Sequence, residues 1–333
     1  MDIMEHVFAK AKAKPMRVAF PEAENDKIQQ AAVQCRNEGI CIPVFVGEPE
    51  KIRAAADAIG VDITDIEIVD AADEALLERV IGGFTKINDL FSEKSLRRKC
   101  KDPMILAMIM QALGELDVTF AGIDHTTADV IIAGKTFIGL QEGIATISSV
   151  GIADIPGYNG SEGQYLAFGD SAVCVFPKAE KLASIAINAC DTVKALTDWE
   201  PRCALLSYST CGSGGDNEAV TRIIEAVKIA NEQRPDLAID GEFQLDSALN
   251  PAVAAKKVKR ESKVAGKANI IIWPDLNAGN IGVKLIQQFA GADAYGPMLQ
   301  GFAKIVCDCS RGAPVSELVG NIAMSCVRAQ EMK

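Results

Sequence analysis

The sequence predicts an α/β protein with a largely parallel sheet, and three observations support this class. Short β-branched runs alternate along the chain with longer helical stretches, which is the rhythm of βαβ units. Hydrophobic residues make up 49% of the chain, enough for a packed core, and aromatic residues only 5%, so that core is mostly aliphatic. The length of 333 residues suits two domains of about 150 residues each.

The elements follow from this alternation, taken in chain order. In the first half we expect strands at residues 17–21, 41–46, 66–70 and 118–121, and helices at residues 1–14, 25–39, 48–60 and 103–114. In the second half we expect strands at residues 171–176, 203–208, 237–240, 268–273 and 304–307, and helices at residues 181–196, 218–232 and 316–333. Residues 151–165 are rich in Gly, Pro and Asn, which predicts loops or hairpins.

The net charge of −11 disfavours nucleic acid and anionic membranes as partners. No apolar run reaches the ~18 residues needed to span a bilayer, and the N-terminus has no apolar signal segment. We therefore expect a cytoplasmic protein with no nucleic-acid partner and no membrane attachment. An anionic substrate is still possible, because a local cluster of arginine and backbone N–H groups overrides the global charge.

Ten cysteines are scattered along the chain, and there are only two histidines. Cys307 and Cys309 form a single C-x-C, whereas a zinc site normally needs two closely spaced pairs of ligands. We expect reduced, buried cysteines and no metal site. The glycine patterns of dinucleotide-binding and ATP-binding loops are also missing.

Residues 209–216, Ser-Thr-Cys-Gly-Ser-Gly-Gly-Asp, connect a predicted strand to a predicted helix. Small residues let backbone N–H groups approach an anion at the positive end of the helix. One hypothesis is therefore a phosphate-binding turn that uses Ser209, Thr210, Gly212 and Ser213. The alternative is a flexible loop in which Asp216 or Asn217 caps the helix.

Residues 308–313, Asp-Cys-Ser-Arg-Gly-Ala, follow an apolar strand. Ser310 offers a hydroxyl beside Arg311, and arginine binds phosphate through two parallel hydrogen bonds. The alternative is an ordinary surface turn.

Three further segments carry polar groups. Residues 273–282 place Asn277, Gly279 and Asn280 in a predicted loop at the end of a strand, where open α/β sheets bind ligands, or where Asx turns simply hold the loop. Acidic residues alternate through residues 240–246, facing a cleft or solvent. His125 precedes a helix start at Thr126 or Thr127 and is either a base or a loop anchor.

Together these motifs resemble the phosphate acetyltransferase (phosphotransacetylase) family over nearly the whole chain. The resemblance rests on residues 17–22, 169–177, 182–186, 206–213, 240–246, 265–269, 274–282, 296–301 and 308–312. It implies two α/β/α sandwich domains with mostly parallel sheets and an inter-domain cleft. The domains would be residues 1–140 with 304–333, and residues 141–303. It also implies a homodimer that binds acetyl phosphate, phosphate and coenzyme A as substrates, with no tightly bound cofactor and no metal.

The resemblance also assigns roles to individual residues. It implies that Arg311 holds the phosphoryl group, that Ser310 stabilises the developing oxyanion, and that Glu317 removes the proton of the coenzyme A thiol. Ile132 occupies the position where related enzymes carry a phosphate-binding arginine, and Lys135 lies one turn further on. The stretch around residues 96–101 is shortened, and Arg97 or Arg98 stands for another phosphate ligand.

The activity that the resemblance implies is reversible transfer of an acetyl group between acetyl phosphate and coenzyme A, by direct attack of the thiolate in a ternary complex. Three alternatives stay open: a phosphotransacylase specific for propionyl or butyryl groups, a non-catalytic acetyl-CoA-sensing domain, and a dehydrogenase of similar two-domain shape. The Ile132 substitution favours the sensing domain, and the Ser310–Arg311 pair favours the enzyme. The missing nucleotide fingerprint disfavours the dehydrogenase.

Overall fold

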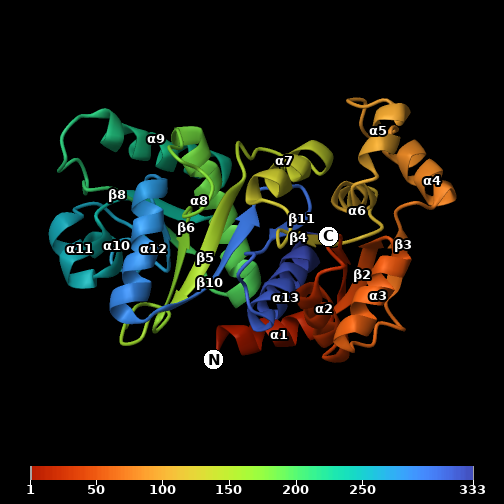
Figure 1. The fold of residues 1–333 in the computed structure, drawn as a ribbon. Helices are drawn as coiled ribbons and strands as arrows, with labels where there is room; N and C mark the ends of the chain where they lie inside the picture. Colours follow the sequence, from red (N-terminus) through yellow and green to blue (C-terminus); the bar gives the residue numbers. More distant parts are fainter. Residues whose placement is uncertain (1, 333) are drawn as a thin grey trace. The chain divides into compact units, whose positions relative to one another are not determined.

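The computed structural model describes residues 2–332, which fold into two units, each built around its own sheet (Figure 1). One unit contains the residues up to Gln141 together with those from Phe302 onward, and the other contains Glu142–Gly301. Across residues 2–332, every helix is too short or too polar to cross a bilayer. The predicted α/β class with mostly parallel sheets is confirmed.

The first unit has a five-stranded, all-parallel sheet in the order β11-β4-β1-β2-β3. Its strands are β1 (Met16–Phe20), β2 (Cys41–Gly47), β3 (Glu67–Asp70), β4 (Val118–Ala121) and β11 (Ile305–Asp308), each within about one residue of the predicted runs. Three buried phenylalanines on neighbouring strands, Phe20, Phe45 and Phe120, pack together in an otherwise aliphatic core. Because the strands are parallel, their carboxyl ends share one edge of the sheet, and β1, β4 and β11 are neighbours there.

The helices of the first unit cover this sheet. They are α1 (Ile3–Ala13), α2 (Asp26–Asn37), α3 (Pro49–Ile59), α4 (Glu74–Phe84), α5 (Glu93–Lys99), α6 (Pro103–Ala112), α7 (Thr127–Phe137) and α13 (Val315–Glu331). Helix α13 packs on β11, β4 and β1 and lies beside α1 and α2, while α6 packs on β4, β1 and β2. Helices α4 and α5 were not predicted, although α4 buries Leu77, Val80, Ile81 and Phe84 at helical spacing.

The second unit has a six-stranded sheet in the order β10-β5-β6-β9-β7-β8. Its strands are β5 (Ser148–Asp154), β6 (Tyr165–Gly169), β7 (Arg202–Leu206), β8 (Ala238–Phe243), β9 (Ile270–Ile272) and β10 (Asp293–Gln300). Strands β6, β9, β7 and β8 are parallel, whereas β5 pairs antiparallel with β6 and β10. The helices are α8 (Ala179–Thr197), α9 (Glu218–Gln233), α10 (Leu245–Leu249), α11 (Pro251–Lys257) and α12 (Leu276–Ala290).

One predicted strand, residues 171–176, is wrong. These residues form bends, and the strand is instead β6, which ends at Gly169. The physical reason is Asp170, whose buried carboxylate accepts hydrogen bonds from the backbone N–H groups of Ala172, Val173 and Cys174 at 3.0, 3.2 and 2.7 Å. Donors bound to one carboxylate are not available to a neighbouring strand, so the chain curls around Asp170.

Candidate active site

The turn between β11 and α13 carries Ser310 and Arg311, and both residues are exposed. Its backbone is held by Lys27 in the first turn of α2, whose Nζ donates to the carbonyl oxygens of Ala313 at 3.0 Å and Arg311 at 3.5 Å. The Ser310 hydroxyl accepts from the N–H of Gly312 at 3.3 Å. Within residues 2–332 the Arg311 guanidinium forms no ion pair. The turn therefore presents a hydroxyl and a cation that forms no ion pair within residues 2–332, on a fixed backbone, which suits an anionic ligand.

Asp308, the last residue of β11, lies two residues before Ser310. Its Oδ2 accepts from the Thr127 hydroxyl at 2.6 Å, while its Oδ1 is buried and has no hydrogen-bond partner among residues 2–332. Burial raises the pKa of Asp308 to about 6; the hydrogen bond from Thr127 opposes this, and the negative charge of Glu22 adds to it. We did not assign Asp308 a role from the sequence, although a carboxylate that ends a strand just before a Ser-Arg pair was a usable signal.

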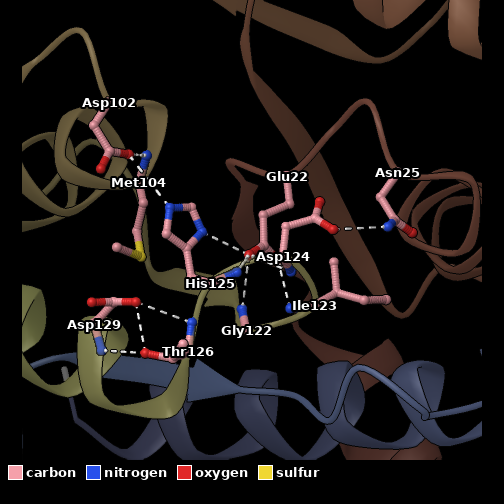
Figure 2. A network of polar contacts seen from close by, with 10 residues as sticks. All are labelled: Glu22, Asn25, Asp102, Met104, Gly122, Ile123, Asp124, His125, Thr126 and Asp129. Atoms are coloured by element: carbon pink, nitrogen blue, oxygen red, sulfur yellow. Dashed lines mark hydrogen bonds and ion pairs between the residues drawn. The ribbon is translucent and has the colours of Figure 1, made fainter.

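A second buried carboxylate, Glu22, organises the loop between β4 and α7 (Figure 2). It follows β1 and accepts from the backbone N–H groups of Gly122, Ile123, Asp124 and His125 at 2.8–3.2 Å. The Nδ1 of His125 lies 2.7 Å from the same carboxylate. Four amides and one imidazole around a carboxylate that is almost fully buried fix this loop, so Glu22 satisfies donors that would otherwise lie unpaired.

His125 is thereby held between two carboxylates. Its Nδ1 faces Glu22, and its Nε2 lies 3.9 Å from Oδ1 of Asp102, which also caps α6 by accepting from the N–H of Met104 at 2.9 Å (Figure 2). This arrangement matches the loop-anchor hypothesis for His125, because both ring nitrogens face groups that fix neighbouring elements.

Helix α7 begins beside these groups with a reciprocal capping box. The Thr126 hydroxyl accepts from the N–H of Asp129, and the Asp129 carboxylate accepts from the N–H and hydroxyl of Thr126. The bonds from Thr126 lower the pKa of Asp129, and the nearby His125 and Arg311 lower it further. Asp129 thus lies within the electrostatic reach of Arg311. Ile132, one turn along α7, is 63% exposed.

The other predicted cations of the first unit differ in their availability. Arg97 on α5 is engaged by two carboxylates of α4, Glu74 and Glu78. Arg98 on α5 and Lys135 in the last turn of α7 are exposed, and neither forms an ion pair within residues 2–332. The structure therefore leaves Arg98 and Lys135 free for a ligand and makes Arg97 a link between two helices.

Glu317 lies in the first turn of α13 and is exposed. Its backbone N–H donates to the carbonyl oxygen of Pro314 at 3.1 Å, and its carboxylate makes no ion pair within the described chain. It is thus seven residues after Ser310 on the same connection, with a free carboxylate.

In the second unit, the predicted phosphate-binding turn at residues 209–216 is closed by a carboxylate of the chain itself. Glu242, buried at the end of β8, accepts from the Ser209 hydroxyl and from the Gly212 N–H, both at 2.7 Å. The Ser209 hydroxyl in turn accepts from the N–H of Gly214 at 2.9 Å. Three further amides also have acceptors inside the loop: Thr210 on the Ser213 hydroxyl, Ser213 on the Thr210 carbonyl and Gly215 on the Gly212 carbonyl. These amides therefore already have acceptors within the chain, and Asn217 is the N-cap of α9, as the alternative expected.

Asn277, Gly279 and Asn280 lie on the first turns of α12 and not in a loop, which corrects the prediction for residues 273–282. The helix forms because Asp275 caps it, accepting from the N–H of Ala278 at 3.1 Å. Asn277 and Asn280 are exposed. Gly279 has a packing role, since a Cβ there would lie 2.4 Å from the carbonyl oxygen of Asp170.

No three His, Cys, Asp or Glu side chains gather where they could share a metal ion, as far as residues 2–332 show. The ten cysteines are all free thiols, and eight of them are buried.

Comparisons with known proteins agree with the fold. The model of the phosphate acetyl/butaryl transferase family matches residues 2–326. Phosphate acetyltransferases of Treponema pallidum and Clostridium acetobutylicum are each 38% identical to this chain, with 99% of both chains covered. A solved phosphotransacetylase from Streptococcus pyogenes superposes with a TM-score of 0.89 at 32% identity, covering 99% of this chain and 98% of the other.

The chain therefore belongs to the phosphate acetyl/butaryl transferase family. As a member of that family it is an enzyme, an acyltransferase.

Proposed function

We propose that this acyltransferase moves an acetyl group reversibly between acetyl phosphate and coenzyme A. The observation that carries the proposal is the β11–α13 turn, where the Arg311 guanidinium is exposed and free of ion pairs beside the Ser310 hydroxyl. The phosphate acetyltransferases that resemble this chain over nearly their full length support the choice of substrates.

In the proposed step, the thiolate sulfur of coenzyme A attacks the carbonyl carbon of acetyl phosphate within a ternary complex. A carbon–sulfur bond forms, and the bond from that carbon to the bridging phosphate oxygen breaks, so that phosphate leaves with the electron pair. Arg311 holds the phosphoryl group throughout, and Ser310 donates to the carbonyl oxygen as negative charge develops there. Glu317, with its free carboxylate, accepts the thiol proton. The homodimer and the cytoplasmic location stay predictions from the sequence.

The test is the rate at which acetyl-CoA forms from acetyl phosphate and coenzyme A, measured for wild type, Arg311→Ala and Arg311→Lys. Loss of a preorganised group that binds transition-state charge costs on the order of 10²–10³-fold in rate, so we expect a fall of that size in kcat/KM for acetyl phosphate with Arg311→Ala. Arg311→Lys should recover only part of it, because lysine offers one point charge and no planar fork.

The matched control is Arg53→Ala, which removes an exposed arginine of α3 in the same unit and should leave the rate unchanged. Wild type that forms no acetyl-CoA would contradict the proposal. Faster turnover of propionyl or butyryl phosphate in direct competition would move the assignment to a longer acyl group.

A second candidate, a non-catalytic domain that senses acetyl-CoA, is favoured by one observation: Ile132 is exposed on α7 where related enzymes carry a phosphate-binding arginine. Binding of acetyl-CoA without any turnover of short acyl phosphates would support it over the enzyme.

A further inference from the structure

Asp308 and Thr127 join two elements that meet at the Ser310–Arg311 turn. Asp308 ends β11 opposite Ala121 of β4, and Thr127 is the first residue of α7. Their side chains meet at 2.6 Å, between Oγ1 of Thr127 and Oδ2 of Asp308. The bond therefore ties the start of α7 to the residue from which the turn departs.

The space around the Asp308 carboxylate is closed by Gly122. A Cβ at Gly122 would lie 2.3 Å from Oδ1 of Asp308 and 2.7 Å from the N–H nitrogen of Cys309, and Gly122 has a φ of +111°. Only glycine fits there without displacing the start of the turn. The Cys309 N–H donates to the Ala121 carbonyl at 2.8 Å, so the backbone on both sides of Asp308 is fixed to β4.

Several charged and titratable groups face this pair. Glu22 follows β1, His125 and Asp129 belong to the loop before α7 and to its first turn, and Lys27 in α2 binds the far end of the turn. Arg311 lies on the turn itself. Asp308 therefore lies among the groups that hold the turn. No hydrogen bond or ion pair joins the side chains of Asp308 and Arg311.

We propose that Asp308 is a positioning residue for the acyl transfer reaction, acting through Thr127 to fix the turn that carries Ser310 and Arg311. This inference rests on the proposed function. In its ionised form the carboxylate accepts a charge-assisted hydrogen bond from Thr127, which is stronger than a bond between neutral groups. The raised pKa of Asp308, about 6, means that this form is lost as the pH falls through about 6.

The experiment compares wild type with Asp308→Asn, Thr127→Val and Thr127→Ser in the acetyl-CoA assay. Because a displacement of about 1 Å outside the reacting groups can cost on the order of 10²-fold, we expect kcat/KM for acetyl phosphate to fall about ten- to hundredfold in Asp308→Asn and Thr127→Val. Thr127→Ser keeps the hydroxyl and should stay within about twofold of wild type. The KM for coenzyme A should not change.

Two readouts separate positioning from mere loss of folding. The ratio of wild-type to Asp308→Asn activity should rise as the pH passes upward through about 6, since the substrate titrations cancel in the ratio. Amide hydrogen exchange of residues 309–313 should quicken in Thr127→Val and return to normal in Thr127→Ser, whether or not the protein is active. A wild-type kcat/KM in Asp308→Asn, with an activity ratio that does not change with pH, would overturn the inference and leave the proposed function intact. Inactive wild type would overturn the proposed function alone, and the amide exchange of residues 309–313 would still decide whether Thr127 and Asp308 fix the turn.

Discussion

Two loops, one in each unit, are organised by a buried glutamate in different ways. In the first unit, Glu22 binds four backbone amides of the β4–α7 loop, and the neighbouring turn leaves the side chains of Ser310 and Arg311 exposed. In the second unit, Glu242 accepts hydrogen bonds from the loop of residues 209–216. The glycine and serine content of this loop had predicted an anion-binding site.

This difference shows what decides whether a glycine-rich loop can bind a ligand anion. Glycines let the backbone N–H groups converge, but convergence is equally useful for holding a carboxylate of the same chain. In residues 209–216 the Ser209 hydroxyl and the Gly212 N–H bind the Glu242 carboxylate, and the N–H groups of Thr210, Ser213, Gly214 and Gly215 bind oxygens of the loop itself. The β11–α13 turn has fewer glycines, yet it carries a guanidinium with no acidic partner within residues 2–332.

The largest expected effect comes from Glu22→Gln. The glutamine side chain has the size of the glutamate side chain, but its NH₂ group would face a backbone N–H donor. Its oxygen also lacks the negative charge that strengthens the hydrogen bonds from the other N–H groups. Leaving buried donors poorly satisfied costs about 1–3 kcal/mol per group, so we expect the free energy of unfolding to fall by about 3 kcal/mol in urea denaturation. Amide exchange of residues 122–125 should quicken.

Glu24→Gln is the control for this variant, because Glu24 is exposed in the same connection after β1. Its unfolding free energy should stay within about 0.5 kcal/mol of wild type. If Glu22→Gln behaved like Glu24→Gln, the buried carboxylate would not be what holds the loop.

Glu242→Gln should have a smaller effect. Both of its recorded donors, the Ser209 hydroxyl and the Gly212 N–H, meet the same oxygen, which an amide oxygen can replace. Exchanging two charge-assisted bonds for two neutral ones should cost about 1–2 kcal/mol in urea denaturation. Glu225→Gln, at an exposed position on α9, is the matched control. A loss as large as that of Glu22→Gln would mean that the two loops depend equally on their carboxylates.

The sequence predicted all five strands of the first unit because each is a short, mostly apolar run between longer helical stretches. Strands β1, β2, β3, β4 and β11 lie within about one residue of the expected positions. In the second unit, residues 171–176 have the same apolar pattern but do not form a strand, because Asp170 binds their amides. A single carboxylate therefore overrode the local preference, and composition alone does not reveal which amides a side chain will reach.

The candidate site was predictable to a similar degree. Ser310 and Arg311 became candidates because they follow an apolar strand and match the Ser-Arg pair of the family that the sequence resembles, and the structure leaves both exposed. Glu22 and Asp308 were missed as contributors, because their roles depend on the pairing of β1, β4 and β11, which are far apart in the sequence. Arg97 or Arg98 was expected to bind phosphate; the partners of Arg97, Glu74 and Glu78, lie on α4, a helix that the sequence did not predict.

The smallest expected effect tests whether a second guanidinium on α7 would assist Arg311 in binding acetyl phosphate. Ile132→Arg places a second guanidinium on α7, where the isoleucine is 63% exposed, so the folding cost should be within about 0.5 kcal/mol. An exposed ion pair contributes about 0–1 kcal/mol, so the KM for acetyl phosphate should fall by at most about fivefold. The gain should shrink as salt is added, because salt screens exposed charges. Ile87→Arg adds the same charge at a position that is 62% exposed in the same unit, and it should leave the KM unchanged. Equal behaviour of the two variants would show that position 132 does not face the phosphoryl group.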